Sequence, residues 1–202
     1  MKKVLLIVVV TLLGLGNVSA QEVKLGAKLG LNLSSLRSDM DFDSKIGFNL
    51  GVFAEINLSD KLIFQPELLY STQGASLEES FDSNSFKVTN SVDYLNIPLI
   101  LKYGVTDKLF LEFGPQLGFL LSGKSKYEET YGGETESETE DIKEFTNSID
   151  FGLNFGVSFD IAENIMIGAR YNLGLSNIID EEDSGDEKLQ NSVFSLSLGY
   201  RF

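Results

Sequence analysis

Residues 194–202 read Phe-Ser-Leu-Ser-Leu-Gly-Tyr-Arg-Phe, with an apolar or aromatic residue at every second position. Side chains of a β-strand point alternately to its two faces, so this pattern predicts a strand with one apolar and one polar face. The same alternation marks residues 151–159 and 165–176, where Gly, Asn and Ser take most of the polar positions. No segment shows a sustained helical period, and we therefore expect an all-β fold.

The alternation predicts eight strands in total. The others are expected at residues 23–34, 46–58, 62–72, 92–103 and 109–122. Each is long enough for the roughly 9–11 residues that a tilted transmembrane strand needs. The connections between them alternate in length. Three are short (59–61, 104–108 and 162–164) and four are long (35–45, 73–91, 123–147 and 177–191). This asymmetry is typical of an eight-stranded antiparallel up-and-down barrel of the outer membrane, with short periplasmic turns and long external loops.

The first 20 residues form a separate unit. A basic start, Met1-Lys2-Lys3, precedes an apolar run over residues 4–15, and Asn17-Val18-Ser19-Ala20 ends in small residues. This order is that of a secretory signal peptide, and the apolar run is too short for a comfortable transmembrane helix. We therefore expect a signal peptide at residues 1–20, cleaved on export, and a barrel domain at residues 21–202. With no cysteine in the chain, a lipid-anchored lipoprotein is excluded.

The composition of the two strand faces distinguishes a membrane barrel from a soluble one such as a lipocalin. A water-facing strand surface is usually rich in Lys, Glu and Thr, whereas the polar positions here are mainly Gly, Asn and Ser. Small residues suit the narrow interior of an eight-stranded barrel. The apolar positions are large and rich in aromatic residues, as a lipid-facing belt requires. We therefore expect the apolar face to contact outer-membrane lipid.

Charge and residue usage exclude several classes of function. The formal charge is −14, and removal of Lys2 and Lys3 with the signal peptide makes it −16. This argues against a nucleic-acid partner, whose phosphates require a cationic surface. The chain has neither histidine nor cysteine. The Ser-His and Asp-His devices used by enzymatic small barrels therefore cannot be built, and we expect no enzyme activity and no cofactor.

Charged residues also occupy positions that the alternation turns towards the barrel interior. Four acids and four bases make up this expected network: Lys28, Glu55, Glu67, Lys102, Glu112, Asp150, Arg170 and Arg201. Ion pairs among them would satisfy the charges and fill the lumen. A structural plug is favoured over a gated pore, because aqueous channels appear only in barrels of 16 or so strands.

The long connections are acidic, most clearly in residues 123–147 and 177–191. Clustered carboxylates could bind Ca²⁺ or Mg²⁺, but the spacing around residues 180–187 matches no EF-hand. Runs of charge are usually solvated, mobile loops, and we expect these to be mobile, external and accessible to protease.

Three prolines fall inside expected strands: Pro66, Pro98 and Pro115. Proline cannot donate to a sheet ladder, and sheets tolerate it mostly at bulges. A bulge or a locally widened ladder at each proline is therefore predicted, and with it a more deformable wall suited to lateral contacts.

The last strand carries a further pattern. A terminal Phe in register with an apolar stripe resembles the C-terminal signal read by the barrel assembly machinery. This signal would comprise Phe194, Leu196, Leu198, Tyr200 and Phe202.

Four segments resemble the outer-membrane β-barrel family typical of Bacteroidota, which includes PorT-like proteins. They are residues 65–71 (Gln-Pro-Glu-Leu-Leu-Tyr-Ser), 94–103 (Tyr-Leu-Asn-Ile-Pro-Leu-Ile-Leu-Lys-Tyr), 114–118 (Gly-Pro-Gln-Leu-Gly) and 170–172 (Arg-Tyr-Asn). The resemblance covers essentially the whole chain after the signal peptide and implies a barrel in the bacterial outer membrane. It carries no shared catalytic motif.

Three functions follow as hypotheses. The first is a structural or surface-interaction barrel of the OmpA/OmpX membrane-domain kind. The second is a narrow, gated channel for ions or small solutes. The third is a PorT-like accessory component of secretion.

Overall fold

The computed structural model describes residues 23–38, 42–81, 84–179 and 188–202. The expected signal peptide and the acidic residues 180–187 lie outside this part of the chain. The elements are β1 (Val23–Arg37), β2 (Asp43–Asn57), β3 (Leu62–Phe81), β4 (Asn84–Gly104), β5 (Leu109–Tyr131), β6 (Glu134–Asp141), the 3₁₀ turn η2 (Lys143–Phe145), β7 (Ile149–Asp160), β8 (Ile165–Gly174) and β9 (Gln190–Arg201). No helix in the described ranges is both long and apolar enough to cross a membrane.

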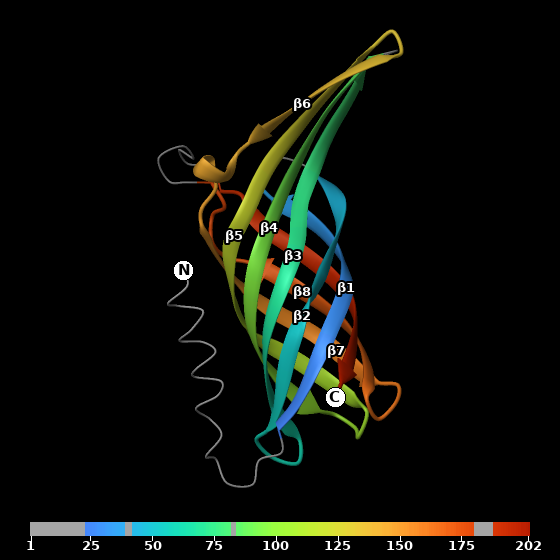
Figure 1. The fold of residues 1–202 in the computed structure, drawn as a ribbon, viewed down its shortest axis with the longest axis vertical. Coiled ribbons are helices and arrows are strands. Elements are labelled where there is room, and N and C mark those ends of the chain that lie inside the picture. Colours follow the sequence, from blue (N-terminus) through green and yellow to red (C-terminus); the bar gives the residue numbers. More distant parts are fainter. Residues whose placement is uncertain (1–22, 39–41, 82–83, 180–187) are drawn as a thin grey trace.

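Eight of these strands close into a ring (Figure 1). Each pairs antiparallel with its neighbours in the order β1-β2-β3-β4-β5-β7-β8-β9, and β9 pairs with β1. The closing ladder runs from Gly26 opposite Arg201 to Arg37 opposite Gln190. The predicted eight-stranded antiparallel up-and-down barrel is confirmed.

The two rims differ as the connection lengths predicted. At one rim the strands are joined by tight turns, such as the one in which Ser59 and Leu62 exchange backbone hydrogen bonds at 3.1 and 3.3 Å. The C-terminal end of β9 lies at this rim too (Figure 1). The opposite rim is uneven, because three adjacent strands continue far beyond the others.

This extension, which we call the flap, consists of residues 75–81 of β3, 84–91 of β4, 124–131 of β5 and the whole of β6. β3, β4 and β5 have 20, 21 and 23 residues, and β6 pairs along the outer part of β5 (Figure 1). The expectation of irregular loops at residues 73–91 and 123–147 is therefore wrong over most of both ranges.

Two physical features explain why these acidic segments form strands. Apolar and aromatic residues face one another across the ladders, with Leu77 opposite Val88 and Val88 opposite Tyr127. The β5–β6 turn contains Gly132 and Gly133 with φ of +56° and +91°, the conformation that a tight two-residue hairpin requires. Because β6 alternates Glu with Ser and Thr, it has no apolar face. The alternation of apolar and polar residues that predicts a strand is therefore absent from it.

A bulge or a locally widened ladder was predicted at each proline, and the structure shows the widened ladder without a bulge. The pairs β2–β3, β3–β4 and β4–β5 keep one register on both sides of Pro66, Pro98 and Pro115, respectively. Two facing residue pairs drop out of the ladder beside each proline, but no residue is inserted. Proline removes a donor without lengthening its strand, so a gap in the ladder is sufficient. The register shifts lie instead at residues 44–49 of β2 and 93–94 of β4. The three gaps lie on the adjacent strands β3, β4 and β5, and the deformable wall inferred from them stays a prediction.

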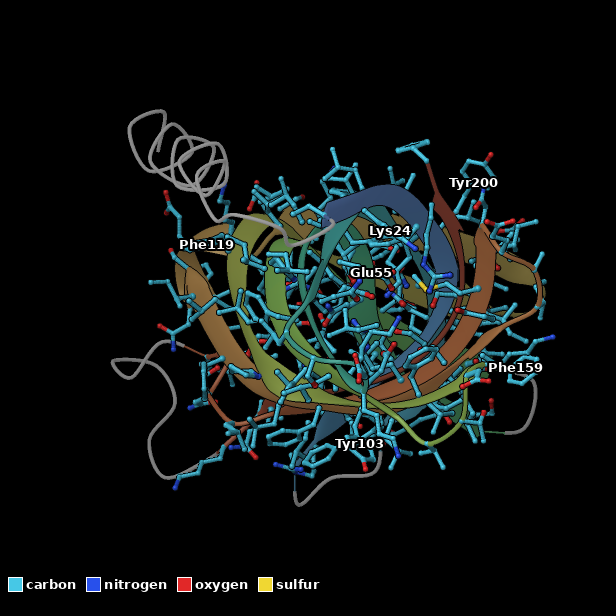
Figure 2. All side chains as sticks on the ribbon, turned by 90° about the horizontal axis from the view of Figure 1, so that it is seen from below. Lys24, Glu55, Tyr103, Phe119, Phe159 and Tyr200 are labelled. Atoms are coloured by element: carbon cyan, nitrogen blue, oxygen red, sulfur yellow. The ribbon has the colours of Figure 1, made fainter. Side chains whose placement is uncertain are left out.

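Large apolar side chains cover the outside of the ring, while polar side chains fill the inside. Leu31 on β1 is 65% exposed, and Phe113 and Phe155 pack against each other on the outer face with ring centroids 5.2 Å apart. Figure 2, seen along the barrel, shows Tyr103, Phe159 and Tyr200 at the periphery and Glu55 within the ring. This is the distribution expected of a wall facing hydrocarbon.

We predict that the hairpin turn of the flap depends on its two glycines. Replacing both, in the variant Gly132→Val/Gly133→Val, forces β-branched residues into positive φ, at a cost of about 1–2 kcal/mol per residue. Amide hydrogen exchange in β6 should accelerate, while exchange in the ring strands should not change. Ser137→Val is the control, since it adds a β-branched residue within β6 without a positive φ. Equal exchange in all three proteins would show that the glycines do not hold the turn.

Candidate functional site

The lumen holds two clusters of ion pairs, one above the other. The lower cluster, near the rim of short turns, is centred on Glu55 of β2. Lys102 Nζ lies 2.7 Å from Glu55 Oε1, and Arg201 Nε lies 2.6 Å from Glu55 Oε2. Arg201 also reaches Asp160 at 2.8 Å. The cluster joins four strands, and Lys102 is completely buried.

Apolar contacts enclose the lower cluster. The ring of Phe110 lies 4.9 Å from Lys102 Nζ, and Met166, only 2% exposed, places its sulfur 3.7 Å from the same atom. The ammonium group therefore has an ion partner, an aromatic face and a thioether around it.

The upper cluster is centred on Arg170 of β8. Its guanidinium donates to both carboxylate oxygens of Glu67 at 2.9 and 3.0 Å and to Glu112 Oε2 at 2.6 and 3.1 Å. Lys28 Nζ adds a bond of 2.9 Å to Glu67. The planar guanidinium thus bridges Glu67 on the opposite wall and Glu112 on β5, two strands away, a geometry that a point charge could not reproduce.

Each cluster contains two acids and two bases and is formally neutral. Seven of the eight residues that the alternation turned inward belong to these clusters. Asp160 completes the lower one and was not predicted, because the expected strand ended at residue 159. Its position was readable nonetheless: it shares the parity of Asp150, Asn154 and Ser158, all buried on the inner face of β7.

Asp150 stands apart from both clusters. Its carboxylate accepts hydrogen bonds from Ser176 Oγ at 2.7 Å and from Asn191 Nδ2 at 3.2 Å. Asn191 in turn lies 3.4 Å from the hydroxyl of Tyr94. The expectation that Asp150 joins the ionic network is therefore wrong. β7 begins at the flap rim, and Asp150 is its second residue. Arg170 lies opposite Gly156 of β7, further along the strand towards the rim of short turns.

A layer of amides and hydroxyls lies above the upper cluster. Asn32 is its centre: it donates to Ser71 Oγ at 3.0 Å and accepts from Asn49 at 2.6 Å and from Ser195 at 2.8 Å. A cavity of about 40 Å³ remains within this layer. The following lining residues each have a buried oxygen without a hydrogen-bond partner: Gln73, Asn96 and Asn172. The space suits a few ordered water molecules, which such oxygens can bind.

Buried apolar residues lie at the flap end of the lumen. One cluster contains Leu36, Ala75 and Ile178, and a second contains Val92, Tyr94 and Leu120. Phe42, Ile179 and Leu189 pack against the first. The lumen is thus occupied along its length by ion pairs, then amides, then apolar side chains.

The C-terminal apolar stripe lies on the outside of the ring. Each of its members is between 42% and 77% exposed: Phe194, Leu196, Leu198, Tyr200 and Phe202. On β1 they face apolar residues, with Leu198 opposite Leu29 and Leu196 opposite Leu31. The stripe is therefore part of the lipid-facing surface beside the closing seam.

No group of three or more acidic side chains able to hold a metal ion occurs in the described part of the chain. The acidic residues 180–187 lie outside it.

Among solved structures, the chain is similar to several small outer-membrane barrels. It is 16% identical to Ail, the attachment invasion locus protein of Yersinia pestis, solved with the heparin analogue sucrose octasulfate; the match covers 90% of this chain and 99% of that one, with a TM-score of 0.46. The chain is 15% identical to Neisserial surface protein A; the match covers 90% of this chain and 99% of that one, with a TM-score of 0.47. It is 14% identical to a major outer membrane protein of Thermus thermophilus; the match covers 90% of this chain and 100% of that one, with a TM-score of 0.48. No curated protein matches the chain.

A family model described as an outer membrane protein beta-barrel domain matches residues 19–180. These residues include most of the ring, both ion-paired clusters except Arg201, and the whole flap. With its closed ring and apolar exterior, the chain belongs to this outer membrane β-barrel family and is a protein of the bacterial outer membrane.

Proposed function

We propose that this protein is a non-enzymatic barrel with a closed lumen, which anchors the flap at the cell surface for interaction with a partner. The filled lumen is the observation that supports this most. Two neutral ion-paired clusters, an amide layer and apolar side chains follow one another from rim to rim. In this proposal the interior ionic network is structural; it comprises Lys28, Glu55, Glu67, Lys102, Glu112, Arg170 and Arg201. Asp150 contributes by accepting hydrogen bonds from uncharged side chains.

Two further roles belong to the same proposal. The C-terminal stripe is the segment that the barrel assembly machinery would bind, since it is apolar, exposed and in register up to Phe202. The resemblance of residues 65–71 and 94–103 to small barrels of Bacteroidota supports a place among them. A role in secretion like that of PorT has no support in the geometry of the lumen or the flap.

The closed lumen predicts that the protein does not conduct. In a planar bilayer the purified barrel should show no stepwise current in 1 M KCl, because charged and polar side chains occupy the whole cross-section. The comparison variant Glu55→Ala/Arg201→Ala shortens one acid and one base of the lower cluster and keeps the net charge constant. Any current that it carries would therefore reflect the space opened in the lumen and not a change in net charge. Reproducible single-channel steps from the unaltered protein would favour the channel hypothesis over the one proposed here.

Removing Arg170 should destabilise the barrel strongly. Arg170→Met leaves Lys28 as the one cation of the upper cluster beside Glu67 and Glu112, and breaking a buried pair in this way costs about 3–5 kcal/mol. Urea unfolding in lipid vesicles measures the loss. Lys87→Met is the control, because it breaks the exposed Lys87–Glu78 pair, which typically contributes about 0–1 kcal/mol. Equal unfolding midpoints for the two variants would contradict a structural role for the network.

The terminal residue should matter for assembly more than for stability. Phe202 lies on the lipid-facing surface, so Phe202→Ser should lower the unfolding free energy of the refolded barrel by no more than the roughly 1.5–3 kcal/mol that removing a phenylalanine side chain from water contributes. In cells, the amount of heat-modifiable barrel in the outer membrane should nevertheless fall. Phe159→Ser, which removes another lipid-facing phenylalanine on β7, away from the stripe, should have a similar effect on the unfolding free energy and leave the amount of assembled barrel unchanged. Normal assembly of Phe202→Ser would remove the assembly role.

A further inference from the structure

The flap has two faces that differ in charge. Opposite residues of paired strands share a face, so the register assigns each side chain. The inner face continues the lumen side and contains residues 77 and 79 of β3, 86, 88 and 90 of β4, 125, 127, 129 and 131 of β5, and 134, 136, 138 and 140 of β6. The outer face contains the residues between them.

Charges on the outer face are balanced. Lys87 forms an ion pair of 3.0 Å with Glu78, and Lys126 forms one of 2.7 Å with Glu128. The hydrogen bond to Glu78 raises the pKa of the Lys87 ammonium above its ordinary value. Lys124 faces Asp141 across the β5–β6 ladder, so this face has three cations and three acids.

The charged side chains of the inner face are all acidic among the described residues. It has six carboxylates and no Lys or Arg: Glu79, Glu129, Glu134, Glu136, Glu138 and Glu140. Glu129 and Glu136 are directly opposite, an arrangement that destabilises a sheet when nothing compensates the charge. Aromatic rings lie between the acids, with Tyr127 opposite Glu138 and Tyr131 opposite Glu134.

A second feature lies at the foot of the same face. Ser125, between Asn90 and Glu140 in the register, is only 2% exposed, and its hydroxyl oxygen has no hydrogen-bond partner. Most buried polar groups in proteins are paired, so this hydroxyl can take a donor from a bound group. The inner face therefore combines uncompensated carboxylates, aromatic rings and an unpaired buried hydroxyl.

We propose that the inner face of the flap binds an extended, cationic polypeptide segment of a partner protein. Charge complementarity selects the partner: lysine or arginine side chains would compensate the six acids and could stack on Tyr127 and Tyr131. This inference rests on the proposed role of the barrel as an anchor at the cell surface and names the class of partner for it.

Spacing favours a peptide over a metal ion. Glu134, Glu136, Glu138 and Glu140 repeat at every second residue, about 7 Å apart along the strand. One Ca²⁺ binds oxygens at about 2.3–2.6 Å and cannot collect carboxylates spread over this length. An extended segment with a base at every second position has the same repeat, so each base can meet one acid.

The test uses the purified full-length barrel in an uncharged detergent and two fluorescent 12-residue peptides. One alternates Lys and Ser, and the other has the same composition in Lys-Lys-Ser-Ser order. The inner-face variant E134Q/E136Q/E138Q is compared with the outer-face variant E78Q/E128Q/D141N, which removes the same number of acids. Heat-modifiable gel mobility verifies that each variant is folded.

The alternating peptide should bind more tightly than its isomer, and more weakly as salt is added. The inner-face variant should lose at least about ten-fold in affinity, and the outer-face variant less than about two-fold. Absence of binding, equal loss in both variants, or binding of Ca²⁺ in place of the peptide would overturn the proposal. Bilayer conductance of the same preparations is independent of this result: a closed lumen without peptide binding would refute only the inference about the partner.

Discussion

Closure of the ring is the constraint on which the rest of this structure depends. Hydrocarbon offers no partner to a backbone N–H or C=O group, so a sheet can span a membrane only if its first and last strands pair. The β1–β9 ladder, from Gly26 opposite Arg201 to Arg37 opposite Gln190, provides this pairing. Eight strands closed in this way leave an interior only wide enough for side chains. The charged residues of the two ion-paired clusters therefore find their partners on other strands.

The ion pairs follow directly from that narrowness. Glu67 and Arg170 are 103 residues apart in the sequence but meet across the lumen. Because side chains alternate between the faces of a strand, a shift of one residue would move Glu67 from the lumen to the lipid. The pairs thus oppose register errors as well as filling space. Beyond the ring the constraint ends, and the flap carries balanced charges on one face and only acidic ones, beside apolar and aromatic side chains, on the other.

Much of this architecture was readable from alternation, because a period of two assigns each residue to lipid or lumen. Lys28, Glu55 and Arg170 were placed inward on that basis, and the structure puts them there. The alternation of apolar and polar residues could not predict β6, because β6 contains no apolar residue and forms a strand only through its pairing with β5. The prolines left two alternatives open, because a strand can accommodate a missing N–H with a bulge or with a gap in the ladder, and only the folded register shows that the gap occurs.

The central claim is that buried ion pairs close the lumen, and Arg170 is where it can be measured most directly. Magic-angle-spinning NMR of the protein in lipid bilayers can report both the distance from the Arg170 guanidinium nitrogens to the carboxyl carbons of Glu67 and Glu112 and the exchange of the guanidinium protons with water. The structure predicts direct contact with both carboxyl groups and slow exchange. A guanidinium that exchanges rapidly and lacks contact with either acid would contradict this account, because the lumen at that level would then be filled with water.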